Sequence, residues 1–195
     1  SYRSVPMEQL VKEAQSLAEQ GVKELILVAQ ETTVYGQDIY GEKSLHKLLK
    51  ELCQIKGIRW IRVLYCYPEE IYDELIQTMK EEKKICHYLD LPIQHASDRI
   101  LKRMGRRTTQ AELVEIVNKL RREIPDIVLR TTLISGFPGE TQEDHEELMG
   151  FVDEMEFDRL GVFTYSPEED TPAATMPDQV AEEVKEARRD EIMEL

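Results

Sequence analysis

Five short runs of apolar and β-branched residues alternate along this chain with stretches whose apolar residues recur at helical spacing. Alternation of this kind indicates parallel β-α units joined by right-handed crossovers. A length of 195 residues suits one domain over residues 1–195. The expected strands are residues 24–29, 60–65, a central strand that includes Tyr88, residues 127–134 and residues 159–164.

Parallel β-α units can form a doubly wound sheet or a barrel, and polar residues inside the strands distinguish the two. Arg130 and Thr132 lie two residues apart and share one face of a strand, as do Asp90 and Gln94 in the central strand. A doubly wound sheet covered by helices has no place for a buried arginine, whereas a barrel with a polar ligand in its mouth does. We therefore expect an α/β fold in which parallel strands form a partial, open β/α barrel.

Capping residues predict where several helices begin. Ser4 is expected to cap a first helix that Gly21 ends, and a last helix should run from about Asp178 to the end of the chain. The spacing of Thr109 to Glu112, and that of Thr141 to Asp144, predicts two capping boxes. The residues expected on the buried side of the last helix are Val180, Val184, Ala187 and Ile192.

The composition excludes several classes of protein. No apolar run approaches the roughly 18 residues of a membrane span and no signal peptide opens the chain, so we expect a soluble, cytoplasmic protein without a membrane contact. From Gly136 onward there are 19 acids and four bases, a net charge of −15 against −14 for the whole chain, which leaves +1 for residues 1–135. Direct DNA binding is disfavoured because phosphate binding needs clustered cations. In this chain only Lys102, Arg103, Arg106 and Arg107 form a dense basic group.

The cysteines and histidines give little sign of metal chemistry. Cys53, Cys66 and Cys86 are too far apart for a metal site and are read as small buried apolar residues, so no metal ligand is expected in this chain. His95 alone falls on an expected functional edge. Among the other histidines, His46 and His145 are expected on helix surfaces and His87 is expected to be structural.

The stretch from Tyr88 to Gly105 joins the end of a strand to the start of a helix. Ligands of parallel α/β folds bind at the carboxyl ends of strands, so the polar side chains of Gln94, His95 and Ser97 indicate a binding edge. The alternative is that Ser97 only caps a helix and Gln94 only makes a turn. The chain carries no nucleotide-binding glycine loop and no serine-histidine-aspartate pattern.

Three segments resemble the radical S-adenosylmethionine (SAM) methylthiotransferases. They are Leu91-Pro-Ile-Gln-His-Ala-Ser-Asp98, Arg130-Thr-Thr-Leu-Ile-Ser-Gly-Phe-Pro-Gly-Glu-Thr141 and Phe157-Asp-Arg-Leu-Gly-Val-Phe-Thr-Tyr-Ser-Pro-Glu-Glu168. The resemblance is strongest to the branch that adds a methylthio group to the β-carbon of an aspartate in a small-subunit ribosomal protein. The branch that acts on tRNA adenosine typically has Ser-Gly-Ser where this chain has His95-Ala96-Ser97.

The resemblance implies a transferase that uses SAM and two four-iron four-sulfur clusters. One cluster would sit on a Cys-x-x-x-Cys-x-x-Cys loop after the first barrel strand, and the other in an upstream methylthiotransferase domain; a TRAM domain would follow downstream. The ligands of both clusters are absent from this sequence. We therefore expect the central radical-SAM core of a larger enzyme, lacking the first strand and inactive alone. Two alternatives remain, a tRNA adenosine methylthiotransferase and a metal-free β/α protein that binds a ligand.

The resemblance also implies which residues bind SAM, although each could instead be a packing or capping residue. Gln30 and Glu31 would approach the methionine part, while Gln94 and Ser97 would serve the ribose or the carboxylate. Arg130 and Thr132 would lie near the carboxylate and the sulfonium, and Gly136 and Phe163 would flank the adenine.

Overall fold

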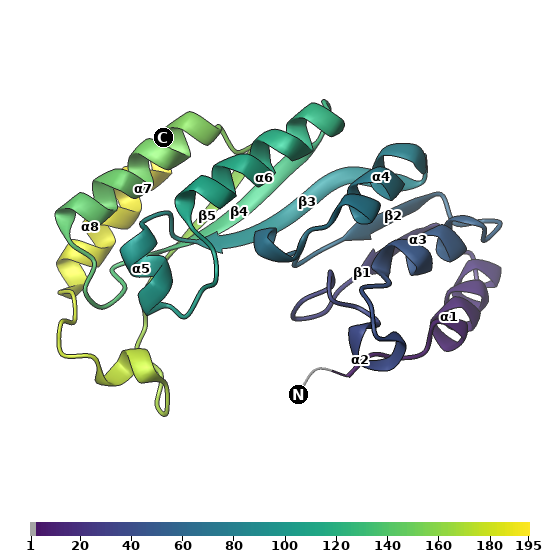
Figure 1. Cartoon of the computed structure of the whole chain (residues 1–195), viewed down its shortest axis with the longest axis horizontal. Helices are drawn as coiled ribbons and strands as arrows, with labels where there is room; N and C mark the ends of the chain where they lie inside the picture. The colour runs from purple at the N-terminus through teal and green to yellow at the C-terminus, as the bar shows by residue number, and fades with distance from the viewer. Residues whose placement is uncertain (1–2) are drawn as a thin grey trace. The chain divides into compact units, whose positions relative to one another are not determined.

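The computed structural model describes residues 3–195, which divide into two compact units (Figure 1). Unit 1 runs to Leu91 and includes Lys119–Val128, and unit 2 consists of Pro92–Asn118 and Leu129–Leu195. The strands form one five-stranded sheet in the order β1-β2-β3-β4-β5. The pairs β1–β2, β2–β3 and β4–β5 are parallel, as the alternation of strands and helices predicts.

Unit 1 carries the first half of this alternation. An apolar face on α3 places Leu45, Leu48, Leu49 and Leu52 in its core, because these residues recur at the spacing of one helix face. Its elements are α1 (Met7–Glu19), β1 (Glu24–Leu27), α2 (Gln37–Tyr40), α3 (Leu45–Cys53), β2 (Trp60–Val63), the 3₁₀ turn η1 (Pro68–Glu70), α4 (Asp73–Glu81) and most of β3 (Ile85–Gln94).

Unit 2 carries the second half, and its last strand was predicted residue for residue as Arg159–Thr164. The Thr141 hydroxyl accepts from the Asp144 N–H and the Asp144 carboxylate accepts from the Thr141 N–H, which confirms the capping box that begins α7. The remaining elements are the end of β3, α5 (Asp98–Arg103), α6 (Gln110–Glu123), which continues into unit 1, β4 (Val128–Ser135), α7 (Gln142–Met155), β5 (Arg159–Thr164), η2 (Pro172–Thr175) and α8 (Glu182–Met193).

Residues of β4 alternate strictly between two environments. Leu129, Thr131 and Leu133 are buried, whereas Arg130 and Thr132 are half-buried on the opposite face. Successive side chains of a strand point to opposite faces, so one face of β4 joins the core and the other carries the polar groups. This is the arrangement that we inferred from the polar residues within the strand.

The first helix begins differently from our prediction. Pro6, and not Ser4, occupies the position before α1, and no side chain caps this helix. The Ser4 hydroxyl instead accepts a hydrogen bond from the Gly36 N–H at 3.1 Å. Gly21 follows the helix with φ of +96°, as expected of a helix-ending glycine.

The buried face of α8 differs in part from our prediction, since Ile192 is buried as expected but Ala187 is exposed. The helix begins at Glu182, and Val184 is 40% exposed. The buried residues are Lys185, Arg188 and Ile192, which lie on one face three and four residues apart. The apolar pattern was misleading because this face packs on hydrogen-bond acceptors, which are described below. No helix within residues 3–195 is both long and apolar enough to cross a membrane.

Candidate functional site

A groove of about 480 Å³ lies in unit 2 at the carboxyl ends of its strands. Gln94 from β3, Thr132 from β4 and Phe163 from β5 line it, so the structure brings three of the predicted cofactor residues together. Segment 166–173, which follows β5, contributes Ser166, Glu168, Thr171 and Ala173 to the same groove.

Gln94 and Phe163 have unusual environments for their residue types. Gln94 has φ of +72° in the left-handed region, which costs a side-chain-bearing residue about 1 to 2 kcal/mol. Phe163 is 58% exposed although it belongs to a strand. A strained backbone beside an exposed aromatic ring is typical of a ligand site, where the ring offers a flat stacking surface.

Arg130 lies on the same face of β4 as Thr132, as predicted. Thr132 pairs in register with Gly161 of β5. A Cβ atom at Gly161 would lie 3.3 Å from Nη2 of Arg130, tighter than most side-chain contacts. Gly161 therefore leaves space on this face for the guanidinium group.

The turn after β4 is held in a conformation that only glycine accepts easily. Gly136 has φ of +78°, and its N–H donates to Oε1 of Glu140 at 3.1 Å. A Cβ atom at Gly136 would lie 2.2 Å from Cγ of Lys185. Lys185 is 2% exposed; its ammonium donates to the Tyr165 carbonyl oxygen and to the Glu182 carboxylate, both at 3.0 Å.

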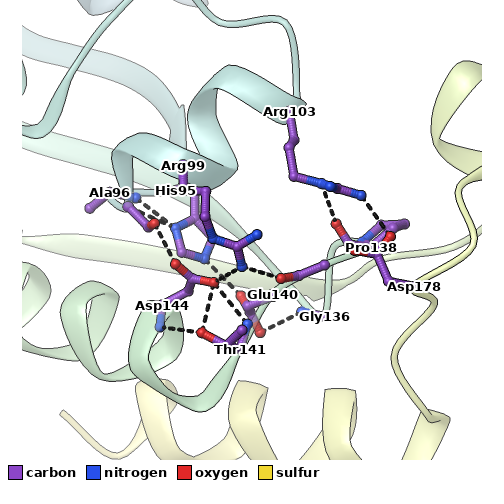
Figure 2. Close-up of polar contacts among 12 residues, drawn as sticks. His95, Ala96, Arg99, Arg103, Gly136, Pro138, Glu140, Thr141, Asp144 and Asp178 are labelled. Carbon is purple, nitrogen blue, oxygen red and sulfur yellow. Dashed lines mark hydrogen bonds and ion pairs between the residues drawn. The ribbon is translucent and has the colours of Figure 1, made fainter.

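Glu140 is the centre of a buried network (Figure 2). Its Oε2 lies 2.7 Å from Nε2 of His95, and both side chains are fully buried. Its Oε1 accepts from Nη1 of Arg188 at 2.8 Å as well as from Gly136. Burial alone would raise the pKa of Glu140, but the bonds from His95, Arg188 and Gly136 outweigh it and leave the pKa below its usual value.

A second buried carboxylate, Asp144, lies beside this network. Its Oδ1 accepts from the Ser97 hydroxyl at 2.7 Å, and its Oδ2 accepts from Thr141 and Arg99. Burial opposes ionisation, but these bonds outweigh burial and lower the pKa of Asp144 to about 2. Ser97 occupies the N-cap position of α5, as the alternative expects, but its hydroxyl makes no capping bond and donates to Asp144 instead.

Gln30 and Glu31 lie in unit 1. Gln30 is exposed, whereas Glu31 is buried and its carboxylate accepts from the N–H groups of Thr33 and Tyr67, both at 2.8 Å, and from the Thr33 hydroxyl. Burial raises the pKa of Glu31 against these bonds. Both of its oxygens therefore hold the loop after β1.

The three cysteines do not fit an iron-sulfur cluster, which binds thiolates. Cys53 and Cys66 are buried, and burial raises the pKa of Cys53 to about 11 and that of Cys66 to about 12. The Cys66 sulfur lies 3.2 Å from the Thr32 hydroxyl. Cys86 is half-buried on β3. These positions confirm that at least Cys53 and Cys66 are small buried residues.

Comparison with known proteins identifies the family. The sequence profile of the radical SAM superfamily matches residues 1–152. The chain belongs to this superfamily. Membership implies SAM and a four-iron four-sulfur cluster. The groove in unit 2 suits the organic cofactor, because it combines an exposed aromatic ring with amide and hydroxyl groups.

Two curated relatives of this radical SAM chain have the same name. A protein of Lachnoclostridium phytofermentans called ribosomal protein uS12 methylthiotransferase RimO is 70% identical over 194 residues, which is 100% of this chain and 44% of the relative. A protein of the same name from Clostridium perfringens is 62% identical over 98% of this chain and 43% of its own length. The chain thus spans less than half the length of these relatives.

Solved structures confirm the fold. Coproporphyrinogen III oxidase HemN of Escherichia coli superposes with a TM-score of 0.70 at 20% identity, over 96% of this chain and 45% of that protein. The radical SAM methyltransferase TsrM of Kitasatospora setae gives 0.68 at 18% identity, over 87% of this chain and 33% of its own. The partial, open β/α barrel that we predicted is therefore the fold of this chain, as it is of these radical SAM proteins.

Sequence reasoning missed several buried polar residues of unit 2. Glu140 and Arg188 were not singled out, and His145 was expected at the surface although it is fully buried. Glu140 follows a Gly-Phe-Pro-Gly turn, where a carboxylate can reach back to the main chain, and this was the available signal. No local pattern marks Arg188, because its partner lies 48 residues away.

Proposed function

We propose that this chain is the radical-SAM core of a methylthiotransferase that acts on ribosomal protein uS12. The methylthio group would go to the β-carbon of an aspartate in that small-subunit protein. The observation that carries the proposal is the 70% identity, over the whole chain, to a relative with this name.

The groove in unit 2 is the proposed SAM site. Phe163 offers an exposed ring against which an adenine can stack, and the Gln94 amide and the Thr132 hydroxyl can bond the ribose or the methionine part. Arg130 on the same face as Thr132 would take the carboxylate as a charge-assisted pair. Gly136 would offer its main chain at the adenine edge.

The other predicted cofactor residues have supporting roles in this proposal. Ser97 fixes the turn after β3 through Asp144, and Glu31 shapes the loop after β1, which leaves Gln30 exposed beside it. Bound SAM supplies the 5′-deoxyadenosyl group with which radical SAM reactions begin. The task of this chain is to hold and orient that group and to exclude water from it.

The two iron-sulfur clusters belong to the proposal for the whole enzyme. The described residues offer no thiolate set for either cluster, since Cys53 and Cys66 are buried, protonated thiols and Cys86 stands on a strand. We therefore assign to the side chains of this chain no reaction step that involves a cluster.

Mass spectrometry of the modified substrate tests the function. The complete gene product, reconstituted anaerobically with iron and sulfide, should add one methylthio group to a single aspartate of uS12 when it is given SAM and a reductant. Replacing that aspartate with asparagine in uS12 should abolish the addition. Modification of a tRNA adenosine in place of uS12 would assign the chain to the tRNA-acting branch.

A further inference from the structure

The Glu140 network, defined as His95, Glu140, Arg188 and the Gly136 N–H, joins segments of unit 2 that lie far apart in the sequence. His95 follows β3, Gly136 and Glu140 follow β4, and Arg188 belongs to α8. A buried carboxylate is costly unless its oxygens are bonded, so each partner is required for the others to stay buried.

The hydrogen bonds of His95 determine its protonation state. Nδ1 of His95 accepts from the N–H groups of Ala96 and Ser97, both at 3.0 Å, and therefore carries no proton. Nε2 must then carry the proton that is donated to Glu140 (Figure 2). Both ring nitrogens are occupied, so His95 has no free site for acid–base chemistry.

What His95 does instead is connect two turns. On one side it holds the main chain of Ala96 and Ser97, directly after the strained Gln94. On the other side it holds Glu140, whose second oxygen fixes Gly136. Gln94 lines the groove and Gly136 begins the turn after β4, so a single carboxylate links the ends of two strands beside the groove.

Helix α8 contributes the third attachment. Nη1 of Arg188 donates both to the Glu140 carboxylate at 2.8 Å and to the Glu140 carbonyl oxygen at 3.0 Å. Lys185, one turn earlier, packs where a Cβ atom of Gly136 would be. The conformation of the Gly136 turn therefore depends on the placement of these two α8 side chains, Lys185 and Arg188.

We propose that His95 is a positioning residue for SAM binding, which acts through Glu140 to fix the turn after β3 relative to the turn after β4. This role requires that Arg188 of α8 also bonds Glu140. The proposal rests on the proposed function for its ligand. Its structural part, the coupling of the two turns, can be measured without any ligand.

His145 provides a matched control. It is also fully buried in unit 2, and its Nε2 also lies 2.7 Å from a glutamate oxygen, that of Glu191 on α8, but its side chain makes no hydrogen bond to either turn. His95→Leu and His145→Leu each remove one buried histidine-carboxylate bond. Only His95→Leu removes the link between the turns, and His95→Gln, which can still donate to Glu140, should restore part of it.

Hydrogen exchange and SAM titration of the complete gene product together test the proposal. His95→Leu should increase exchange at the Gly136 amide, 41 positions away, and should weaken SAM binding about tenfold or more, with partial rescue in His95→Gln. Arg188→Met should have the same two effects, while His145→Leu should lower the melting temperature and leave both readings as in the wild type.

Each other outcome has a defined meaning. Unchanged exchange at Gly136 in His95→Leu, or an equal effect of His145→Leu on exchange and on SAM binding, would overturn the positioning role. Increased exchange with wild-type SAM affinity would overturn it too, because the coupling would then not serve the ligand. A wild-type protein that binds no SAM refutes the proposed function and with it the ligand part of this inference, whereas the exchange data would still decide whether the turns are coupled.

Discussion

The Ser97 hydroxyl donates a 2.7 Å hydrogen bond to Oδ1 of Asp144, which ties the residue before α5 to the first turn of α7. Because Asp144 also caps α7 through Thr141, one carboxylate stabilises two helix starts. Its stabilising effect depends on its charge, and this leads to a prediction about pH.

The pKa of Asp144 is about 2 in the folded protein, against an ordinary value of 3.8. A carboxyl whose folded pKa is depressed stabilises the fold above its unfolded pKa, and this stability is lost as the pH falls through the folded pKa. We expect about 2 kcal/mol of unfolding free energy to disappear between about pH 4 and pH 2. In Asp144→Asn the unfolding free energy, measured by urea unfolding at each pH, should no longer show this step between about pH 4 and pH 2. The exposed Asp153 on the same helix offers a control, since Asp153→Asn should retain the step.

Gly136 and Gly105 make a matched pair for measuring crowding. Both have φ of +78°, but a Cβ atom at Gly105 meets nothing within 4 Å, while one at Gly136 meets Cγ of Lys185 at 2.2 Å. Gly105→Ala should cost about 1 to 2 kcal/mol of unfolding free energy from backbone strain. Gly136→Ala should cost about 1 to 3 kcal/mol more from overpacking. Equal losses in chemical denaturation would mean that Lys185 moves aside freely.

Two substitutions in α8 test which of its faces is buried. Val184 is 40% exposed, so Val184→Asp should change the unfolding free energy by no more than about 0.5 kcal/mol. Ile192 is fully buried, so Ile192→Ala should cost about 2 to 5 kcal/mol. Thermal and chemical denaturation of both variants would check this. A large loss of unfolding free energy in Val184→Asp would instead support the buried helix face that the apolar pattern predicts.

Arg130 should matter for SAM more than for stability. Lysine keeps the positive charge but loses the planar fork of arginine, so Arg130→Lys in the complete gene product should bind SAM about tenfold more weakly with little change in melting temperature. Its register partner on β5, the exposed Arg159, provides the control. Arg159→Lys should leave the affinity unchanged in isothermal titration. Unchanged affinity with a large loss of stability in Arg130→Lys would assign Arg130 to the framework.

The cysteines should fail to hold a cluster. Burial keeps Cys53 and Cys66 protonated, with pKa values of about 11 and 12, and a cluster needs thiolates. This chain, incubated anaerobically with iron and sulfide, should therefore develop no stoichiometric four-iron absorption. A stable cluster that disappears when the three cysteines are replaced with serine would contradict this prediction.

The sequence predicts the strands and the polar strand face well, because both follow from local alternation. In β4 the half-buried Arg130 and Thr132 alternate with buried Leu129 and Leu133, a pattern that is visible in the sequence. The capping box of Thr141 and Asp144 is equally local, since its partners are three residues apart.

The parts that escaped prediction depend on distant partners. Ser4 bonds Gly36 and His145 bonds Glu191, so neither side chain shows its role in its own neighbourhood. The same is true of α8. Its Lys185 and Arg188 are buried while Val184 is exposed, because the two cations have buried acceptors in the Tyr165 carbonyl oxygen and Glu140. Hydropathy ranks such cations last for burial, although paired and bonded cations can be buried.

The ionic buried face of α8 gives the helix a single permitted register. A helix docked by an apolar stripe can slip by one turn, about 5.4 Å, and still find apolar contact, because that attraction has no direction. For α8 the same slip would take Arg188 from Glu140 and Lys185 from the Tyr165 carbonyl oxygen, and it would leave charges buried without partners. The helix is consequently docked in one place or released altogether, with no intermediate sliding positions.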